Sequence, residues 1–294
     1  MAYYKPLRDV AKDYINWAIS PQPRIATGFQ MIDSRTSGGI AAGEVLLFTA
    51  RSGVGKTAVA GNIVINDPKV KTVFFSLEMH GRYIAMRLAA MATNTPTRQI
   101  EEDLRTTERS MALQRLVEGY PHIAIVDKPA MSLKEMGVAC AEIENEWQAK
   151  PDLIVIDFLE LIGGVASLSA VEKIDQVARK VKDFARERDA AVVLLHQVGR
   201  GEGGAGAEPL SMASGRYGGE TYADYVIGAY RVSARKEITQ AEYEQDKAKL
   251  HLQFLKTRSG GGLHPGGYQM RFHPETMRIS EWDYRAEPLF SVPA

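Results

Sequence analysis

The stretch Glu44–Asn66, "EVLLFTARSGVGKTAVAGNIVIN", decides the fold. An apolar run, Val45–Thr49, leads into a glycine-containing turn, and a helical pattern then begins with Lys56 and Thr57. This order suits phosphate binding, because glycines let backbone N–H groups turn toward an anion and a helix N-terminus adds partial positive charge. We therefore expect a nucleotide-phosphate site here. The alternative is a glycine-rich turn that carries Lys-Thr by chance.

In a phosphate loop of this kind, the lysine reaches the β- and γ-phosphates and the hydroxyl that follows it binds Mg²⁺. These roles fall to Lys56 and Thr57, and the expected ligands are ATP and Mg²⁺. Ala50 stands where the strict pattern has its first glycine, and alanine is small enough to serve. The expected nucleotide-binding residues are Ser52, Gly53, Val54, Gly55, Lys56, Thr57 and Ala58.

Composition sets wide limits around this motif. The chain has 294 residues, 45% hydrophobic and 24% charged, which is ordinary for one large or two small globular domains. Lys+Arg and Asp+Glu both number 36, so the balance excludes a uniformly basic surface but not a local basic path for nucleic acid. A single cysteine, Cys140, allows no intrachain disulfide. With neither a signal peptide nor a run of about 18 apolar residues, we expect a soluble, cytoplasmic protein with no membrane partner.

Apolar runs alternate with amphipathic helical patterns along most of the chain, which predicts an α/β fold with a mostly parallel, twisted sheet. One such helix, Leu133–Trp147, is opened by a capping box of Ser132 and Glu135. The expected parallel strands are Val45–Thr49, Thr72–Ser76, His122–Val126, Leu153–Ile156, Ala191–His196 and Tyr225–Tyr230. Three later runs have no helix between them and predict antiparallel strands at the C-terminal edge: Leu250–Leu255, Tyr268–Phe272 and Met277–Trp282.

The N-terminal residues form a separate unit in this scheme. Residues 7–19 have a helical apolar pattern, and two prolines in "SPQPRIATG" interrupt the chain after it. We expect an arm or linker helix over residues 1–24 and the main domain over residues 25–294.

Two acidic residues stand at the ends of expected strands. Glu78 lies just past the run in "TVFFSLEM", and Asp157 ends the run in "PDLIVID". Because ligands of parallel sheets bind at the carboxyl ends of the strands, both acids should lie beside the phosphate loop. Asp157 suits the metal shell and Glu78 suits the general base. The alternatives are a solvated acid at a helix start for Glu78 and a helix N-cap for Asp157.

At this point the chain resembles the RecA-fold ATPase domain of DnaB-type replicative helicases, over about residues 25–283. "FFSLEM" is close to a family hallmark whose glutamate activates water, and "IDFLELI" resembles the Walker B segment. "LLHQVGR" resembles the next motif, which implies that Gln197 senses the γ-phosphate. "FLKTRSGG" resembles the terminal motif, which implies that Lys256 and Arg258 reach the nucleotide of a neighbouring subunit. The implied assembly is a ring of six subunits.

The resemblance also has limits. It does not extend to the family's N-terminal helical domain, so an interaction with primase is in doubt, and such trimming is typical of phage and stand-alone relatives. The resemblance implies single-stranded DNA in a central channel, faced by loops at Gly163–Ser169 and Gly199–Gly215. Arg200 and Arg216 are the candidate DNA contacts, with glycine backbone amides as a second source.

Three functions remain open. The first is a ring ATPase that moves on single-stranded DNA and unwinds duplex during DNA replication. The second is a recombination or repair ATPase of the RecA/RadA type, which binds DNA without unwinding it. The third is an ATP-gated DNA clamp or loader with negligible turnover, against which Glu78, Gln197 and Arg258 argue together.

Overall fold

The structure is a computed structural model, and it describes residues 4–20, 24–164, 169–198, 206–210, 218–234, 238–258 and 262–282. Its centre is a nine-stranded sheet with the order β11-β10-β9-β8-β3-β7-β6-β4-β5. The six strands from β8 to β5 are parallel: β8 (Tyr225–Tyr230), β3 (Val45–Ala50), β7 (Ala191–Gln197), β6 (Leu153–Asp157), β4 (Thr72–Ser76) and β5 (Ile123–Val126). The three antiparallel strands are β9 (Lys249–Thr257), β10 (His264–His273) and β11 (Arg278–Glu281).

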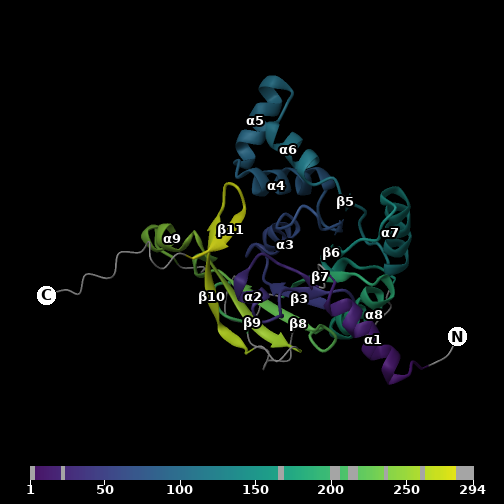
Figure 1. Cartoon of the computed structure of the whole chain (residues 1–294). Helices are drawn as coiled ribbons and strands as arrows, with labels where there is room; N and C mark the ends of the chain where they lie inside the picture. Colours follow the sequence, from purple (N-terminus) through teal and green to yellow (C-terminus); the bar gives the residue numbers. More distant parts are fainter. Residues whose placement is uncertain are drawn as a thin grey trace.

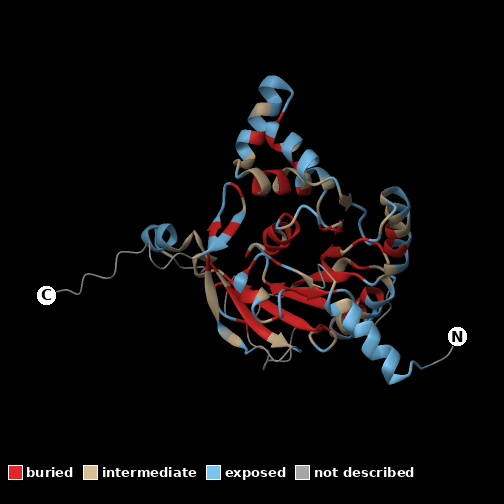
Figure 2. Ribbon diagram, viewed as in Figure 1, coloured by how far each residue is buried: buried red, intermediate tan, exposed pale blue. Residues whose placement is uncertain are grey.

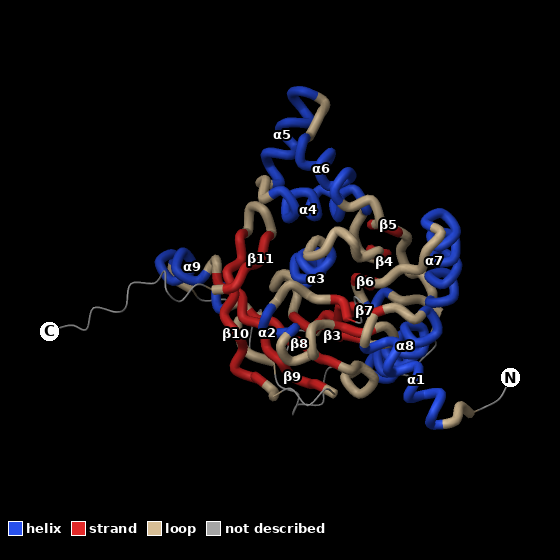
Figure 3. Tube along the Cα trace, viewed as in Figure 1, coloured by secondary structure: helices blue, strands red, loops and turns tan. Residues whose placement is uncertain are grey.

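Helices cover both faces of this sheet (Figure 3). Alternate side chains of β3 enter opposite cores: Leu46 and Phe48 pack on one side, and Val45 and Leu47 on the other. Such burial on both faces explains why β3 is apolar except at Thr49. The first core is closed by α2 (Gln30–Asp33), α3 (Lys56–Val64), α4 (Gly81–Thr93), α5 (Thr97–Thr107) and α6 (Met111–Gly119). The second is closed by α7 (Leu133–Trp147) and α8 (Ala170–Arg188).

Smaller elements complete the chain. A two-stranded antiparallel sheet joins β1 (Arg24–Ile25) to β2 (Ile40–Ala41). The short helix α9 (Gln240–Asp246) lies before β9, beside the C-terminal strands (Figure 1). Short 3-10 turns span Leu159–Leu161 and Val232–Ala234.

The arm is the helix α1 (Leu7–Ala18), which projects from the domain toward the N-terminus (Figure 1). None of its residues is buried, and its apolar side chains, including Leu7, Tyr14 and Ile15, are exposed (Figure 2). Its contact with the domain includes the Trp17 ring, which lies 5.5 Å from the guanidinium carbon of Arg24. An amphipathic helix with an uncovered apolar face lacks the packing that normally stabilises such a helix.

The predicted fold class is confirmed, and the predicted strands are all present with ends that shift by a few residues. Apolar patterning locates a strand's centre better than its ends, and β10 begins at His264, ahead of the predicted start at Tyr268. The capping box of Ser132 and Glu135 is also confirmed. The helices α5 and α6 were not predicted. Most of their residues are exposed and polar (Figure 2), so few apolar positions mark them in the sequence.

Candidate nucleotide site

The site lies where four neighbouring parallel strands end. In the sheet register, Ala50 of β3 is paired with Gln197 of β7, and Ser76 of β4 is paired with Asp157 of β6. The phosphate loop follows β3, and Glu78 follows β4 by two residues. Parallel strands therefore deliver all these groups to one edge of the sheet, where open α/β sheets bind ligands.

The loop between β3 and α3 has the backbone of an anion cradle. Gly53 has φ +78° and Gly55 has φ +118°, both in the region that favours glycine. At Gly53 an added Cβ would meet no atom within 4 Å, so the conformation and not crowding requires glycine there. Gly55 is the residue before α3, so the free N–H groups of that helix's first turn open toward the loop.

Lys56 is held across the mouth of this cradle. Its Nζ donates to the backbone oxygens of Ala50 and Arg51, each at 3.4 Å, and to Oε1 of Gln197 at 3.3 Å. Burial lowers the pKa of Lys56, although Asp157 and two glutamates oppose that shift. The long bonds to neutral oxygens leave the ammonium free to exchange them for a stronger, anionic acceptor.

Thr57 and Asp157 form the second contact of the cradle. Thr57 Oγ1 donates to Asp157 Oδ2 at 2.7 Å, and the other carboxylate oxygen, Oδ1, is buried without a hydrogen bond within the described residues. Burial raises the pKa of Asp157 to about 6, against the lowering effect of the Thr57 hydroxyl. A buried carboxylate with a spare oxygen is incomplete without a cation. Mg²⁺ fits, since it takes one or two protein oxygens and completes its shell with phosphate and water.

A cavity of about 340 Å³ opens beside the phosphate loop, and Glu78 and Arg87 both line it. Their opposite charges attract each other. Glu78 is exposed at the start of the β4–α4 connection. Its loop is fixed at both ends, because Ser76 Oγ donates to the backbone oxygen of Met79 at 2.6 Å and Gly81 N donates to Asp127 at 2.6 Å. A solvent-accessible carboxylate in a fixed loop is well suited to orient a water molecule.

Sequence reasoning did not identify Arg87, which lies nine residues after Glu78 along the chain. Burial lowers the pKa of Arg87, opposed by the charges of Asp157 and Glu78, and its Nε has no hydrogen bond within the described residues. On α4 it stands among apolar residues, and no spacing rule marks it. The packing of α4 on α3, the helix that follows the loop, brings Arg87 into the site.

The other end of the cavity was also missed. It is lined by Arg231, Phe272 and Met277, and the Arg231 guanidinium lies 4.7 Å from the Phe272 ring. Arg231 directly follows β8, the parallel neighbour of β3, so the strand-end rule that identified Asp157 could have found it. Phe272 and Met277 arrive from the antiparallel strands, and no sequence signal connects them to the phosphate loop. A planar cation above an aromatic ring is a stacking surface for a base.

Lys256 and Arg258 do not join this cavity. In the antiparallel pairing of β9 with β8, Lys256 lies opposite Val226, at the amino end of β8. Val226 is paired with Leu47 of β3, so the backbone of Lys256 lies about 10 Å along the strands from the end of β3. Arg258 pairs with Asp224 beside Val45, so the six residues of β3 separate it from the phosphate loop, a distance of roughly 20 Å. Lys256 Nζ donates to the backbone oxygens of Glu220 at 2.5 Å and Thr221 at 3.1 Å, and burial lowers its pKa. Both cations are thus at the edge opposite their own domain's cradle.

The candidate DNA contacts Arg200 and Arg216 lie outside the described residues, as do parts of both expected DNA-facing loops. A second hollow, of about 520 Å³, opens between α7 and α8 next to Gly163 and Gly164. Within the described residues, no group of three or more His, Cys, Asp or Glu side chains could by itself hold a metal ion. The described helices also include none with the length and apolar character that a membrane span requires.

The sheet order, the crossovers and the glycine loop at the end of β3 are those of a RecA-like P-loop domain. Two solved structures share this fold. One is an isolated ATPase domain, with a TM-score of 0.77 over 95% of this chain and 100% of that chain. The other is a DnaB-like replicative helicase described with its primase interactions, with a TM-score of 0.74 over 95% and 69%. Each is 22% identical to this chain.

The sequence comparison narrows this class to one family. The model of the DnaB-like helicase C terminal domain matches residues 24–281, so the chain belongs to that family. The replicative DNA helicase DnaB of Treponema pallidum is 31% identical over 247 residues, which is 79% of this chain and 55% of the relative. The DnaB of Geobacillus stearothermophilus is 30% identical over 185 residues, 60% of this chain and 40% of the relative. The chain thus spans about half the length of these curated relatives.

Proposed function

We propose that the chain is an ATP-hydrolysing motor that acts on single-stranded DNA as a DnaB-type helicase in DNA replication. One observation carries the proposal: Lys56, Gln197 and Glu78 line one cavity, where Asp157 accepts from the lining residue Thr57, whereas Arg258 stands at the opposite edge of the domain. Each edge of the domain thus carries one part of a nucleotide site. Identical subunits that assemble head to tail can then complete each other's nucleotide sites.

The nucleotide is bound by the loop residues. Backbone N–H groups from Ser52 to Ala58 surround the phosphates, and Lys56 exchanges its contact with Gln197 for the γ-phosphate. The base occupies the end of the cavity that Arg231 and Phe272 line. Thr57 and Asp157 would hold Mg²⁺, which supplies charge neutralisation on the phosphate oxygens.

Glu78 acts as the general base toward the attacking water, and Arg87 stabilises negative charge on the same side of the cavity. Gln197 links the γ-phosphate position to β7, because its side chain bonds Lys56 and its backbone N–H donates to Glu160 Oε1 at 2.8 Å. Loss of the γ-phosphate is therefore felt at the end of β7, directly before the second expected DNA-facing loop.

Arg258 and Lys256 supply the cations that the cradle of a neighbouring subunit lacks. In other NTPases an arginine given in trans raises turnover roughly 10³–10⁵-fold. The assembly we propose is a ring of six, in which residues 1–24 form an arm separate from the ATPase domain of residues 25–294. The exposed apolar face of α1 then docks on a neighbouring subunit. In the channel, Arg200, Arg216 and glycine amides contact DNA phosphates, which predicts weak sequence preference and strong salt dependence.

ATPase turnover with and without single-stranded DNA, together with displacement of a strand from a forked duplex, tests the proposal. The helicase predicts DNA-stimulated turnover and ATP-dependent displacement, both lost in Glu78→Gln. Stimulated turnover without displacement would instead support the RecA/RadA-type alternative. DNA binding that requires ATP, with negligible turnover, would support a clamp.

A further inference from the structure

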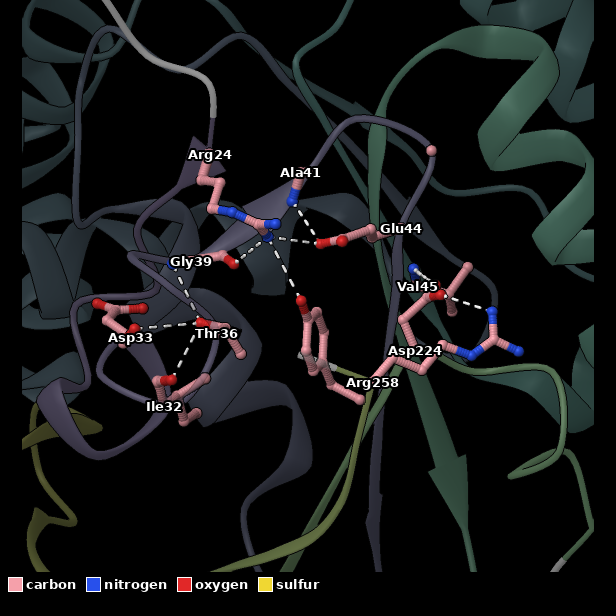
Figure 4. Close-up of polar contacts among 12 residues, drawn as sticks. Arg24, Ile32, Asp33, Thr36, Gly39, Ala41, Glu44, Val45, Asp224 and Arg258 are labelled. Atoms are coloured by element: carbon pink, nitrogen blue, oxygen red, sulfur yellow. Dashed lines mark hydrogen bonds and ion pairs between the residues drawn. The ribbon is translucent and has the colours of Figure 1, made fainter. Parts of the chain in front are cut away.

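Asp224, the residue before β8, is a buried carboxylate that three different elements hold. Figure 4 shows its contacts with Val45 and Arg258. Its Oδ2 accepts from the backbone N–H of Val45 at 2.8 Å and from Lys182 Nζ of α8 at 2.6 Å. Its Oδ1 accepts from Arg258 Nη1 at 3.0 Å. The two backbones are joined as well, since Arg258 N donates to the Asp224 backbone oxygen at 3.1 Å.

These contacts give the two carboxylate oxygens different roles: Oδ2 is held in place, and Oδ1 binds Arg258. The oxygen bound to Val45 and Lys182 is tied to a central strand and a long helix, so it cannot rotate away. The other oxygen is a rigid acceptor for Arg258, whose side chain is 55% exposed and can therefore also face another molecule. An arginine that otherwise samples many rotamers is thereby limited to one direction.

We propose that Asp224 is the positioning residue of Arg258: it aims the guanidinium at the nucleotide of the neighbouring subunit. This inference rests on the proposed function, in which Arg258 acts in trans. Preorganised cations stabilise a transition state because no energy is spent on orienting them during the reaction. Asp224 touches no nucleotide and acts only through Arg258.

Asp224 is also connected, through Val45 and neighbouring residues, to the subunit's own phosphate loop and to the arm helix α1. Val45 begins β3, the strand that ends at the phosphate loop. The neighbouring residues Glu44 and Tyr225 both contact Arg24, at 2.9 Å and 3.4 Å from its Nη1 (Figure 4). Arg24 in turn lies against Trp17 of α1. The residues that hold Arg24 beside the arm are therefore the sequence neighbours of Val45 and Asp224, which hold Arg258.

The first test is Asp224→Asn, assayed for ATPase turnover with single-stranded DNA and for binding of a fluorescent ATP analogue. The amide oxygen will face the two donors Val45 N and Lys182, which leaves the amide NH₂ facing Arg258 and repelling it. Because a misplacement of about 1 Å can cost 100-fold in rate, we expect kcat to fall about 100-fold with KM and nucleotide affinity within about twofold. Unchanged or higher kcat would overturn the proposal.

A double variant separates positioning from a general structural defect. If Asp224 works only through Arg258, Asp224→Asn/Arg258→Ala turns over no more slowly than Arg258→Ala alone. Additive losses would contradict the proposal. The matched control is Asp33→Asn at the end of α2, another carboxylate that accepts backbone N–H bonds, here from Thr27 and Gly28 and not from the residues that hold Arg258. Its kcat should match that of the wild type.

Should Asp224→Asn fail to fold, Lys182→Met tests the same anchor, because it keeps the carboxylate and its bond to Val45. It should lower kcat in the same sense, and that effect should disappear in the Arg258→Ala background. A loss that persists without Arg258 would place the effect elsewhere.

Mixed assemblies then ask in which subunit Asp224 acts. Glu78→Gln retains a normal Arg258, and Asp224→Asn retains a normal cradle, so mixing the two as separated subunits before adding nucleotide should restore turnover. Since each interface draws its two members independently, about a quarter of the interfaces in an equal mixture join the two competent halves. Glu78→Gln mixed with Arg258→Ala is the reference. Restoration there but not with Asp224→Asn would refute the positioning role alone, whereas no restoration in the reference would refute the trans role of Arg258.

Discussion

Burial of the Asp157 carboxylate makes the free energy of unfolding decrease as pH rises, which a surface acid does not do. Without Mg²⁺ and nucleotide, its pKa rises from the ordinary 3.8 to about 6 because the side chain is buried at the tip of β6. A folded state that raises the pKa of an acid favours its protonated form. The resulting stabilisation is complete below pH 3.8 and is lost as pH rises through about 6.

The magnitude follows from the two pKa values. At pH 8 Asp157 is ionised in both the folded and the unfolded state. Keeping the ionised carboxylate buried then lowers the free energy of unfolding by about 3 kcal/mol, since each tenfold change in the proton equilibrium is worth about 1.4 kcal/mol. At pH 5 the unfolded state is already ionised and the folded state is not, so about half of that cost is present. Wild type should therefore lose about 1 kcal/mol between pH 5 and pH 8 from this residue alone.

The perturbation that isolates this contribution is Asp157→Asn, which keeps an oxygen for the Thr57 hydroxyl and cannot ionise. Urea unfolding of both proteins, followed by circular dichroism in a chelator at equal concentration, gives their free energies of unfolding. The difference, wild type minus variant, should fall by about 1 kcal/mol from pH 5 to pH 8. Adding Mg²⁺ and nucleotide at pH 8 should stabilise wild type more than the variant.

A difference that stays constant from pH 5 to pH 8 would refute the argument, because it would mean that Asp157 ionises equally well in both states. A difference that grows with pH would refute it more strongly. It would show that the carboxylate gains a cationic partner in the empty protein and does not wait for a metal ion.

Three further substitutions address the chemistry and the core. Glu78→Gln should leave nucleotide binding intact while turnover falls about 10²–10⁴-fold, the usual worth of a general base, as measured by phosphate release; normal turnover would exclude Glu78 as that base. Lys56→Met should weaken binding of a fluorescent ATP analogue roughly 10–100-fold, because the lost hydrogen bond joins charged groups; unchanged affinity would place the nucleotide elsewhere. Phe254→Ala removes a fully buried ring of β9 and should lower the free energy of unfolding by about 3–5 kcal/mol in urea; a loss below about 1 kcal/mol would mean that the core collapses around the gap.

Local sequence patterns were sufficient to predict the fold class and to identify residues that follow strands. Six continuous apolar runs predict strands buried on both faces, and the carboxyl ends of such strands must meet at one edge. Glu78 and Asp157 are therefore found from chain position alone, and Arg231 would be found by the same rule. The resemblance to a known family added Gln197, Lys256 and Arg258.

The cavity itself is a product of packing between segments far apart in the chain. Arg87 enters it because α4 packs on α3, the helix after the phosphate loop, and Phe272 and Met277 enter it because β10 and β11 extend the sheet past β8. Neither apolar periodicity nor residue type distinguishes these three from ordinary core and surface residues. The shift in the pKa of Asp157 is likewise invisible until its burial is known.

What the sequence determined by itself is which strands exist and which residues stand at their ends, because both depend on neighbours within a few positions. Only the tertiary structure decided that Arg258 lies roughly 20 Å from its own cradle, on the far side of β3, and that Asp224 holds it there. The direction of β9 is the reason: it pairs antiparallel with β8, so the end of β9 that carries Arg258 is brought to the edge where the parallel strands begin.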